Sequence, residues 1–246
     1  LLYPNIDEHM QIIAEEGVKI VFTSAGNPAT WTSKLKAQGM TVVHVIANTK
    51  FAKKAADCGV DAIVAEGFEA GGHNGREETT TLCLIPMIRD AVDIPLIAAG
   101  GIGNGRTMLA AFSLGAEAVQ IGSRFVTSAE SSAHENFKNR IIQSVEGDTR
   151  LSLKQLTPVR LLKNKFAEEV AEAESRGASA EELKELLGRA RAKKGMFEGD
   201  LDEGELEIGQ ISASIRQIQP AAEIVNEIWT SFQNERVRLC QLDLNL

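Results

Sequence analysis

A single histidine among four glycines is the clearest candidate for chemistry in this sequence. In the segment Glu66–Gly75 (EGFEAGGHNG), His73 follows Gly71 and Gly72 directly and precedes Gly75. Glycines let a backbone approach a flat ligand closely, and an imidazole can accept or donate a proton near neutral pH. The structural alternative is a tight turn that exposes a histidine. We expect His73 to be functional.

Two further loops have a composition typical of phosphate binding. Ala98–Gly105 (AAGGIGNG) opens a predicted helix, so its backbone N–H groups can face an anion. Gln120–Arg124 (QIGSR) places the hydroxyl of Ser123 beside Gly122. Two such loops at the last two strands of a (β/α)8 barrel form a frequent phosphate site. The sequence therefore predicts one anion site made from both loops.

The first of these loops also resembles a dinucleotide-binding fingerprint, but its spacing differs. Gly101, Gly103 and Gly105 give G-x-G-x-G, whereas a Rossmann site has G-x-G-x-x-G after its first strand. Here the loop follows the fourth recognisable strand. A Rossmann site is therefore the less favoured interpretation, and the sequence has no P-loop, nucleophile elbow or metal-ligand cluster.

Alternating strands and helices are expected to position these loops. Short β-branched runs between Gly, Asn or Pro predict strands that are buried on both faces, at Val18–Thr23, Thr41–Ala47, Asp61–Ala65, Ile94–Ala99 and Glu117–Ile121. Helical patterns precede or separate them, at about Ile6–Glu16, Ala29–Gln38, Lys50–Cys58, Ile85–Ala91 and Arg106–Leu114. Glycines follow four of the helices where a left-handed residue is expected, at positions 17, 39, 59 and 115.

Strand–helix alternation predicts a parallel α/β sheet, either a TIM (β/α)8 barrel or an open doubly wound sheet. A barrel has eight units and about five are recognisable, so we expect roughly three to precede Leu1. Residues 1–150 are then the C-terminal part of the barrel. Residues 151–215 form a helical lid or inserted subdomain, and residues 216–246 hold a helix that returns to the barrel.

The second half of the chain changes in character. Asn164–Lys194 is charged and helical, with a break at Gly177, and Gly195–Gly209 is acidic and loop-like. A final amphipathic helix is expected over Pro220–Arg236. Four residues form its apolar stripe, namely Ile224, Val225, Ile228 and Trp229.

Composition excludes several classes of function. The 246 residues include 43% hydrophobic residues and carry a net charge of −8, so a nucleic-acid partner is not expected. Apolar runs such as Ile94–Ala99 are too short to span a membrane. The three cysteines are scattered without CxxC spacing, which favours a reducing cytoplasm over a disulfide framework or a zinc site.

Four motifs together resemble one family. They are Glu66–Gly75, Ala98–Gly105, Gly115–Phe125 (GAEAVQIGSRF) and Ser132–Lys138 (SAHENFK). In this order they are similar to the FMN-dependent nitronate monooxygenase (2-nitropropane dioxygenase) superfamily, which includes the flavin-dependent, type II enoyl-acyl-carrier-protein reductases. The resemblance implies a TIM barrel that binds FMN at its carboxyl face, a helical domain over the site, and a homodimer.

The same resemblance assigns roles to individual residues. Gly71 and Gly72 would line the isoalloxazine ring, and His73 would be the active-site histidine. Four residues would bind the FMN phosphate, namely Gly100, Gly101, Gly122 and Ser123.

Two activities of the superfamily remain open, and small differences favour the reductase. Many nitronate monooxygenases have a lysine after the histidine that corresponds to His44, whereas this chain has Val45, as the reductases do. The segment Asn74–Arg76 departs from the reductase pattern. The favoured hypothesis is reduction of an enoyl thioester, carried by acyl-carrier protein or as a small molecule, with NADH or NADPH. The alternatives are oxidation of an alkyl nitronate with oxygen, and a flavin- or phosphate-binding regulatory module without turnover.

Overall fold

The structure, a computed structural model, describes residues 5–241 in two compact units. Of the described residues, the first unit contains those up to Gly67, Thr79–Ala99 and Ala111–Gln120. The second unit contains Phe68–Glu78, Gly100–Ala110 and those from Ile121 onward. The domain boundaries expected near residues 150 and 215 stay a prediction.

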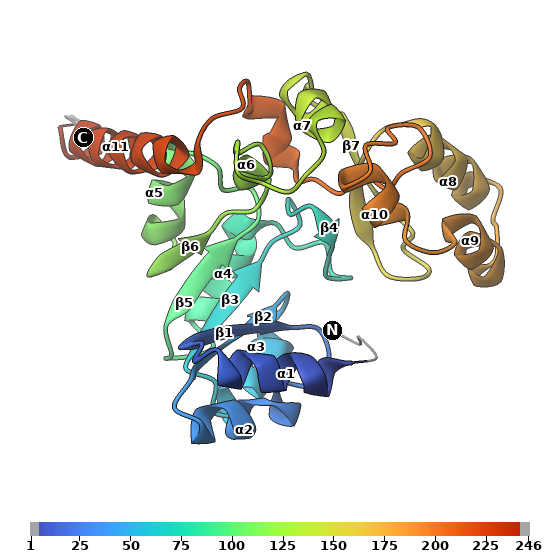
Figure 1. Cartoon of the computed structure of the whole chain (residues 1–246). Helices are drawn as coiled ribbons and strands as arrows, with labels where there is room; N and C mark the ends of the chain where they lie inside the picture. Colours follow the sequence, from blue (N-terminus) through green and yellow to red (C-terminus); the bar gives the residue numbers. More distant parts are fainter. Residues whose placement is uncertain (1–4, 242–246) are drawn as a thin grey trace. The chain divides into compact units, whose positions relative to one another are not determined.

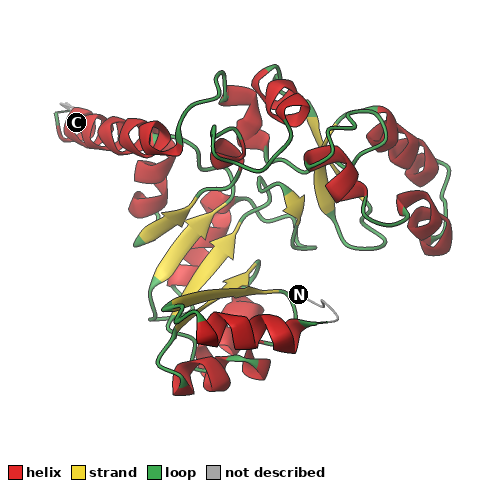
Figure 2. Ribbon diagram, in the orientation of Figure 1, coloured by secondary structure: helices red, strands yellow, loops and turns green. Residues whose placement is uncertain are grey.

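The first unit is built on a parallel sheet (Figures 1 and 2). Its strands, in their order across the sheet, are β1 (Ile20–Ser24), β2 (Thr41–Ile46), β3 (Ala62–Glu66), β5 (Leu96–Ala99) and β6 (Ala118–Gln120). They follow one another as they do in the chain, whereas a doubly wound sheet reverses its strand order at a switch point. The predicted α/β fold of the (β/α)8 type is confirmed, although the described strands form an open sheet.

In the sequence, helices lie before and between the strands of this sheet. They are α1 (Ile6–Glu15), η1 (Pro28–Thr30), α2 (Thr32–Ala37), α3 (Thr49–Asp57), α4 (Thr81–Arg89) and α5 (Gly105–Ser113). Gly39 and Gly59 follow α2 and α3 with φ of +79°, as predicted for left-handed residues at helix ends. The first four residues of β3 are buried, which matches the expectation of strands that pack on both faces.

The second unit contains an antiparallel sheet that the sequence analysis does not predict. Its order is β4 (Gly72–His73), β8 (Val159–Leu162) and β7 (Thr149–Ser152). Its helices are α6 (Ser123–Val126), α7 (Glu135–Ile142), α8 (Lys165–Ser175), α9 (Ala180–Leu187), α10 (Arg191–Met196), η2 (Gln210–Ser214) and α11 (Ala221–Cys240). Strands of two to four residues are too short to show an alternating pattern.

The expected helical stretch divides into α8, α9 and α10, and local capping explains the divisions. The side chain of Asn164 accepts a hydrogen bond from the backbone N–H of Ala167 at 2.9 Å and so caps α8. Gly177 ends that helix with φ of +78°, at the predicted break. Ser179 and Glu182 then form a capping box that starts α9.

Helix α11 confirms the expected C-terminal helix but not the whole of its apolar stripe. Ile224 and Ile228 are buried, whereas Val225 and Trp229 remain 54% and 53% exposed. The buried residues are one i, i+4 pair, so a narrower face packs than the sequence pattern indicates. Among residues 5–241, no helix combines the length and the apolar character that crossing a bilayer requires.

Candidate active site

The loop that carries His73 is held by the antiparallel sheet of the second unit. Strand β4 pairs with β8, so that Gly72 lies opposite Arg160 and His73 lies opposite Val159. The imidazole of His73 is exposed and lies at the wall of a pocket. The predicted histidine is therefore accessible and its backbone is fixed.

Arg160 fixes the start of the same loop. Its side chain is 2% exposed, and its Nε and Nη2 atoms donate to the carbonyl oxygen of Phe68 at 3.2 and 2.8 Å. The guanidinium also lies 4.4 Å from the centre of the Phe68 ring. Because a buried arginine needs such partners, this residue positions the loop.

The segment Glu205–Gly209 packs directly on the Gly71–Gly72 pair. A Cβ atom on Gly71 would lie 2.4 Å from the backbone N of Gly209 and from the carbonyl carbon of Ile208. On Gly72, it would lie 2.6 Å from Oε2 of Glu207. The absence of a side chain at both positions therefore makes room for protein atoms. The placement of Gly71 and Gly72 beside a flavin ring stays a prediction.

The turn at Gly122 and Ser123 has a different environment. The Ser123 Oγ accepts a hydrogen bond from the Gly209 N–H at 2.9 Å, which leaves its O–H to donate to another group. A Cβ atom on Gly122 would meet nothing within 4 Å. Across residues 5–241, the backbone N–H groups of Gly101, Gly122 and Ser123 have no protein acceptor. These open donors fit an anion such as a phosphate group.

Part of the loop Gly100–Gly105 uses its backbone N–H groups to stabilise the helix that follows. Those of Gly103 and Asn104 donate to Oγ1 of Thr107 at 3.1 and 3.2 Å, so they stabilise the start of α5. Gly100 and Gly101 have φ of +89° and +69°, a region that favours glycine. Gly103 and Asn104 therefore use their N–H groups within the protein, and the expected role of Gly100 and Gly101 in phosphate binding stays a prediction.

Gly209 brings the predicted loops together. A Cβ atom at this residue would lie 2.9 Å from both the carbonyl oxygen of Glu69 and Oγ of Ser123, and 3.2 Å from the Gly71 backbone N. A Cβ atom on Gly101 would in turn lie 3.3 Å from Cβ of Glu69. Two loops that are far apart in the sequence therefore meet at Gly209 within the second unit, and Gly101 of the third loop lies beside Glu69.

A pocket of about 250 Å³ lies beside His73. Its walls are mostly apolar, with the polar side chains of His73, Arg191, Glu205 and Glu207 among them, and its apolar lining includes Leu153, Leu156, Val159, Leu187 and Ala192. Apolar walls with a few convergent polar groups are typical of small-molecule sites. The pocket is therefore the candidate substrate site of this unit.

Burial governs the charge of the two glutamates in this pocket. Glu205 is 8% exposed, and burial, together with the charge of Glu207, raises its pKa to about 7. Burial also raises the pKa of Glu207, while the positive charge of His73 acts in the opposite direction. A carboxyl group that titrates near neutral pH in a pocket is a candidate functional group.

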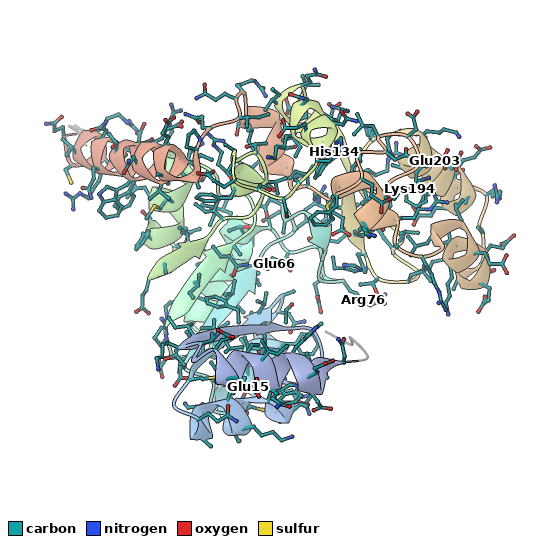
Figure 3. All side chains as sticks on the ribbon, viewed as in Figure 1. Glu15, Glu66, Arg76, His134, Lys194 and Glu203 are labelled. Atoms are coloured by element: carbon teal, nitrogen blue, oxygen red, sulfur yellow. The ribbon has the colours of Figure 1, made fainter. Side chains whose placement is uncertain are left out.

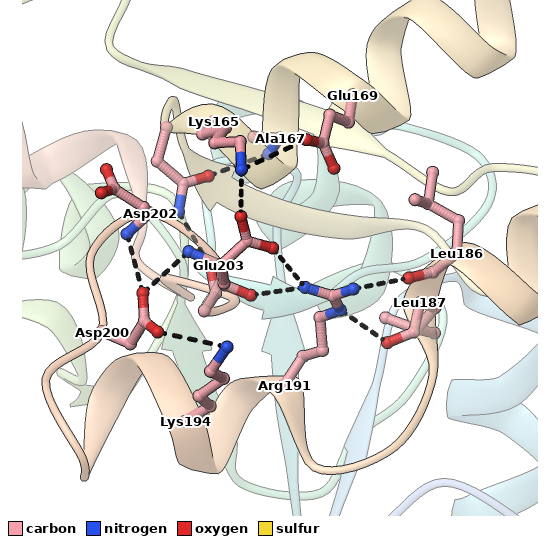
Figure 4. Close-up of polar contacts among 12 residues, drawn as sticks. Lys165, Ala167, Glu169, Leu186, Leu187, Arg191, Lys194, Asp200, Asp202 and Glu203 are labelled. Carbon is pink, nitrogen blue, oxygen red and sulfur yellow. Dashed lines mark hydrogen bonds and ion pairs between the residues drawn. The ribbon is translucent and has the colours of Figure 1, made fainter.

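A polar network fixes the chain that leads into Glu205 (Figure 4). The Arg191 guanidinium donates to the carbonyl oxygens of Leu186, Leu187 and Glu203 at 3.0, 3.0 and 2.7 Å. Lys165 pairs with the Glu203 carboxylate in the same network. Arg191 therefore joins the end of α9 to the acidic loop and keeps that side of the pocket in place.

Two other polar residues, labelled in Figure 3, have structural roles. The Nδ1 atom of His134 accepts a hydrogen bond from the Asn136 N–H at 3.1 Å and caps α7. Arg76 donates to the carbonyl oxygens of Lys154 and Leu156 at 3.1 and 2.5 Å. Neither residue lines the pocket beside His73.

Sequence reasoning missed Glu205 and Glu207 by assigning them to an acidic loop. The run Glu205-Leu206-Glu207-Ile208 alternates charged and apolar residues, which is a strand signal. Leu206 and Ile208 are 1% and 2% exposed, and a backbone bridge joins Glu207 to Leu161 of β8. The alternation could have indicated that both carboxylates lie on one side of an extended segment.

Comparison with known proteins shows the family of this chain. The sequence model of the nitronate monooxygenase family matches residues 4–231. The chain belongs to this family. A probable nitronate monooxygenase of Staphylococcus aureus (strain Newman) is 38% identical over 176 residues, which cover 68% of this chain and 50% of that protein.

Two further similar proteins have names other than nitronate monooxygenase. A (3aS,4S,5R,7aS)-5-hydroxy-7a-methyl-1-oxo-octahydro-1H-indene-4-carboxyl-CoA dehydrogenase of Rhodococcus jostii is 37% identical over 145 residues, which cover 59% of this chain and 40% of that protein. The structure of FabK from Thermotoga maritima superposes with a TM-score of 0.91 at 38% identity, covering 97% of this chain and 76% of that one. The chain thus spans about half the length of the curated relatives or less.

Proposed function

We propose that the protein is an FMN-dependent oxidoreductase that reduces the enoyl thioester of acyl-carrier protein with NADH or NADPH, in fatty-acid synthesis in the cytoplasm. The observation that carries this proposal is the meeting of the His73 loop and the Gly122–Ser123 turn at Gly209. It joins an imidazole beside an apolar pocket to a turn with open hydrogen-bond donors. Family membership supports the same proposal.

The open hydrogen-bond donors of Gly101 and of the Gly122–Ser123 turn fit the phosphate of FMN. Gly101, Gly122 and Ser123 offer backbone N–H groups, and the Ser123 hydroxyl adds a donor that the Gly209 N–H orients. Gly100 would shape the loop, and Gly71 and Gly72 would present their peptide groups to the ring. When bound, FMN would supply hydride transfer, which no amino-acid side chain provides.

His73 would act on the substrate rather than on the phosphate. Its imidazole lies at a pocket whose apolar walls suit an acyl chain. There it would orient the thioester carbonyl or transfer the proton of the α-carbon, since an imidazole can donate a hydrogen bond and can accept or release a proton.

Two findings favour the reductase over the monooxygenase. FabK, the solved structure described above, is a type II enoyl-acyl-carrier-protein reductase. The Rhodococcus relative is named for a coenzyme A thioester substrate. The second candidate is oxidation of an alkyl nitronate, which the family match and the staphylococcal relative favour.

Absorbance of the bound flavin separates these candidates. Purified protein with FMN would be kept without oxygen and mixed first with NADH or NADPH and then with an enoyl thioester. We expect the nicotinamide to bleach the flavin and the thioester to restore its colour. Bleaching by an alkyl nitronate but not by nicotinamide would identify a monooxygenase. FMN binding without bleaching by either would indicate a regulatory module.

Replacement of His73 tests its assigned role. We expect His73→Ala to lower turnover of the enoyl thioester about 100-fold, the range of general acid–base catalysis, while FMN stays bound. The side chain is exposed, so the fold should be retained. Turnover equal to that of the wild type would remove His73 from catalysis.

A further inference from the structure

One wall of the pocket beside His73 is the loop that joins β7 to β8. Strand β7 ends at Ser152, which pairs with Val159 at the start of β8. Residues 153–158 between them form this β7–β8 loop. Three of its residues line the pocket, namely Leu153, Leu156 and Thr157. The loop therefore limits the room that the pocket has on this side.

The β7–β8 loop contains a strained residue. Leu153 is 1% exposed and has φ of +57°, a region that favours glycine. The N–H of Leu156 donates to the Leu153 carbonyl at 2.9 Å and closes a turn around it. Strained backbone persists only where the surrounding structure holds it. The wall therefore depends on contacts from outside the loop.

Arg76, which Figure 3 labels, supplies such contacts. Its Nη1 and Nη2 atoms donate to the carbonyl oxygens of Lys154 and Leu156 at 3.1 and 2.5 Å. A guanidinium is planar and presents its donors as a rigid fork, so it can hold both carbonyls at one spacing. Because Leu156 lines the pocket, Arg76 fixes the position of this wall.

The segment that carries Arg76 is also attached to both ends of the loop. The N–H of Asn74 donates to the Pro158 carbonyl at 2.8 Å, and the carboxylate of Glu78 pairs with Lys154 at 2.5 Å. The segment follows His73 directly in the chain. Arg76 is the member of it that reaches the middle of the loop, where Leu156 lies.

We propose that Arg76 is a specificity-determining positioning residue: by holding Leu156 in the wall of the pocket, it limits the length of the acyl chain that the pocket accepts. This inference rests on the reduction of an enoyl thioester proposed above. Arg76 acts through Leu156, since it does not line the pocket itself. It lies in the segment Asn74–Arg76 that departs from the reductase pattern, so the limit is expected to be particular to this chain.

The first test compares two substrates of the FMN-loaded enzyme that differ in chain length, crotonyl and dodecenoyl pantetheine. The measured quantity is the ratio of kcat/KM for dodecenoyl to that for crotonyl. Leu156→Ala should raise this ratio about 10-fold or more, since a single methylene in an apolar pocket already changes specificity about 10-fold. Arg76→Ala should raise it about 3-fold or more, because the wall can then move outward, and should leave crotonyl turnover nearly unchanged.

A double variant shows whether both residues act through the same wall. If they do, the ratio for Arg76→Ala with Leu156→Ala should equal that for Leu156→Ala alone. The control Arg150→Ala removes an arginine of β7 that pairs with Glu168 and does not line the pocket. Arg76→Lys keeps the charge but loses the fork, so it should raise the ratio as Arg76→Ala does.

The second test needs no turnover. Isothermal titration calorimetry with butyryl and dodecanoyl pantetheine, which are saturated, gives a Kd for each chain length. Arg76→Ala should shift the ratio of the two Kd values toward the long chain, as in the first test. Arg76 is exposed, so its variants should fold, and urea unfolding would verify this.

The outcomes separate this inference from the proposed function. If the wild type reduces neither enoyl thioester, the proposed function fails, and calorimetry still decides the role of Arg76. Four results would overturn that role: an unchanged Kd ratio in Arg76→Ala, an equal shift in Arg150→Ala, a wild-type ratio in Arg76→Lys, or effects that multiply in the double variant. Failure of the wild type to bind either saturated thioester would overturn it as well.

Discussion

The glycines at positions 71 and 122 belong to motifs that look alike in the sequence, yet the structure gives them opposite surroundings. At Gly71, the place of a side chain is filled by the backbone of Ile208 and Gly209. At Gly122, that place is empty and the neighbouring N–H groups have no protein acceptor among the described residues. A glycine of the first kind is needed by the fold, whereas one of the second kind leaves room for a ligand.

Gly71→Ala should have the largest effect on stability. Its Cβ atom would overlap backbone atoms at 2.4 Å, and backbone cannot move aside as the end of a side chain can. We expect a loss of about 3 kcal/mol in the free energy of unfolding, the upper range for overpacking. Urea unfolding measures this loss. A variant as stable as the wild type would show that the two segments are not in close contact.

Glu205→Gln should change stability with a defined pH dependence. Burial raises the pKa of Glu205 from its ordinary 4.5 to about 7, so the folded protein binds this proton more tightly than the unfolded chain does. The stabilisation that this bound proton gives to the folded protein is fully present below about pH 4.5. It is lost as the pH rises through 7. Glutamine has no charge to bury. The free energy of unfolding of the variant should therefore exceed that of the wild type by about 2 kcal/mol at pH 8.

The control for this experiment is Glu198→Gln, since that carboxylate is exposed. Unfolding would be followed in urea at pH 8 and again near pH 4.5, where the advantage of Glu205→Gln should disappear. If Glu205→Gln were more stable than the wild type by the same amount at both pH values, burial would not raise the pKa of the Glu205 carboxyl. The wall of the pocket beside His73 would then be more open.

Gly72→Ala should have the smallest effect. The nearest atom to its Cβ is the carboxylate end of Glu207, which can turn away, but the residue has φ of +73°. A left-handed alanine costs about 1 kcal/mol, and we expect a loss of that size in urea unfolding. A loss as large as that of Gly71→Ala would show that the Glu207 side chain is fixed in place.

The sheet of the first unit could be predicted from the sequence, but the second sheet could not. Strands β1 and β2 are apolar, β-branched runs followed by helices that end in glycine, and β3 is a similar apolar run, so each signal is local. Strand β4 has two residues and exists because β8, about 85 residues later, pairs with it. No local pattern specifies such a pairing.

The candidate site also contains residues that could be predicted from the sequence and residues that could not. His73, Gly122 and Ser123 stand out because they lie in glycine-containing loops that follow predicted strands, where ligand sites of parallel α/β folds collect. Glu205 and Glu207 do not, since an acidic segment is usually a solvated surface. Only the register of that segment on β8 turns these carboxylates toward the pocket.

Binding of FMN and of riboflavin to wild type and to Gly122→Ala tests the central claim most directly, because the two flavins differ only by the phosphate. Fluorescence quenching would give each Kd, and urea unfolding would verify the fold. We expect the wild type to prefer FMN by about 10-fold or more, and Gly122→Ala to lose most of this preference while its stability changes by less than about 0.5 kcal/mol. An unchanged preference in a folded variant would contradict a phosphate site at this turn.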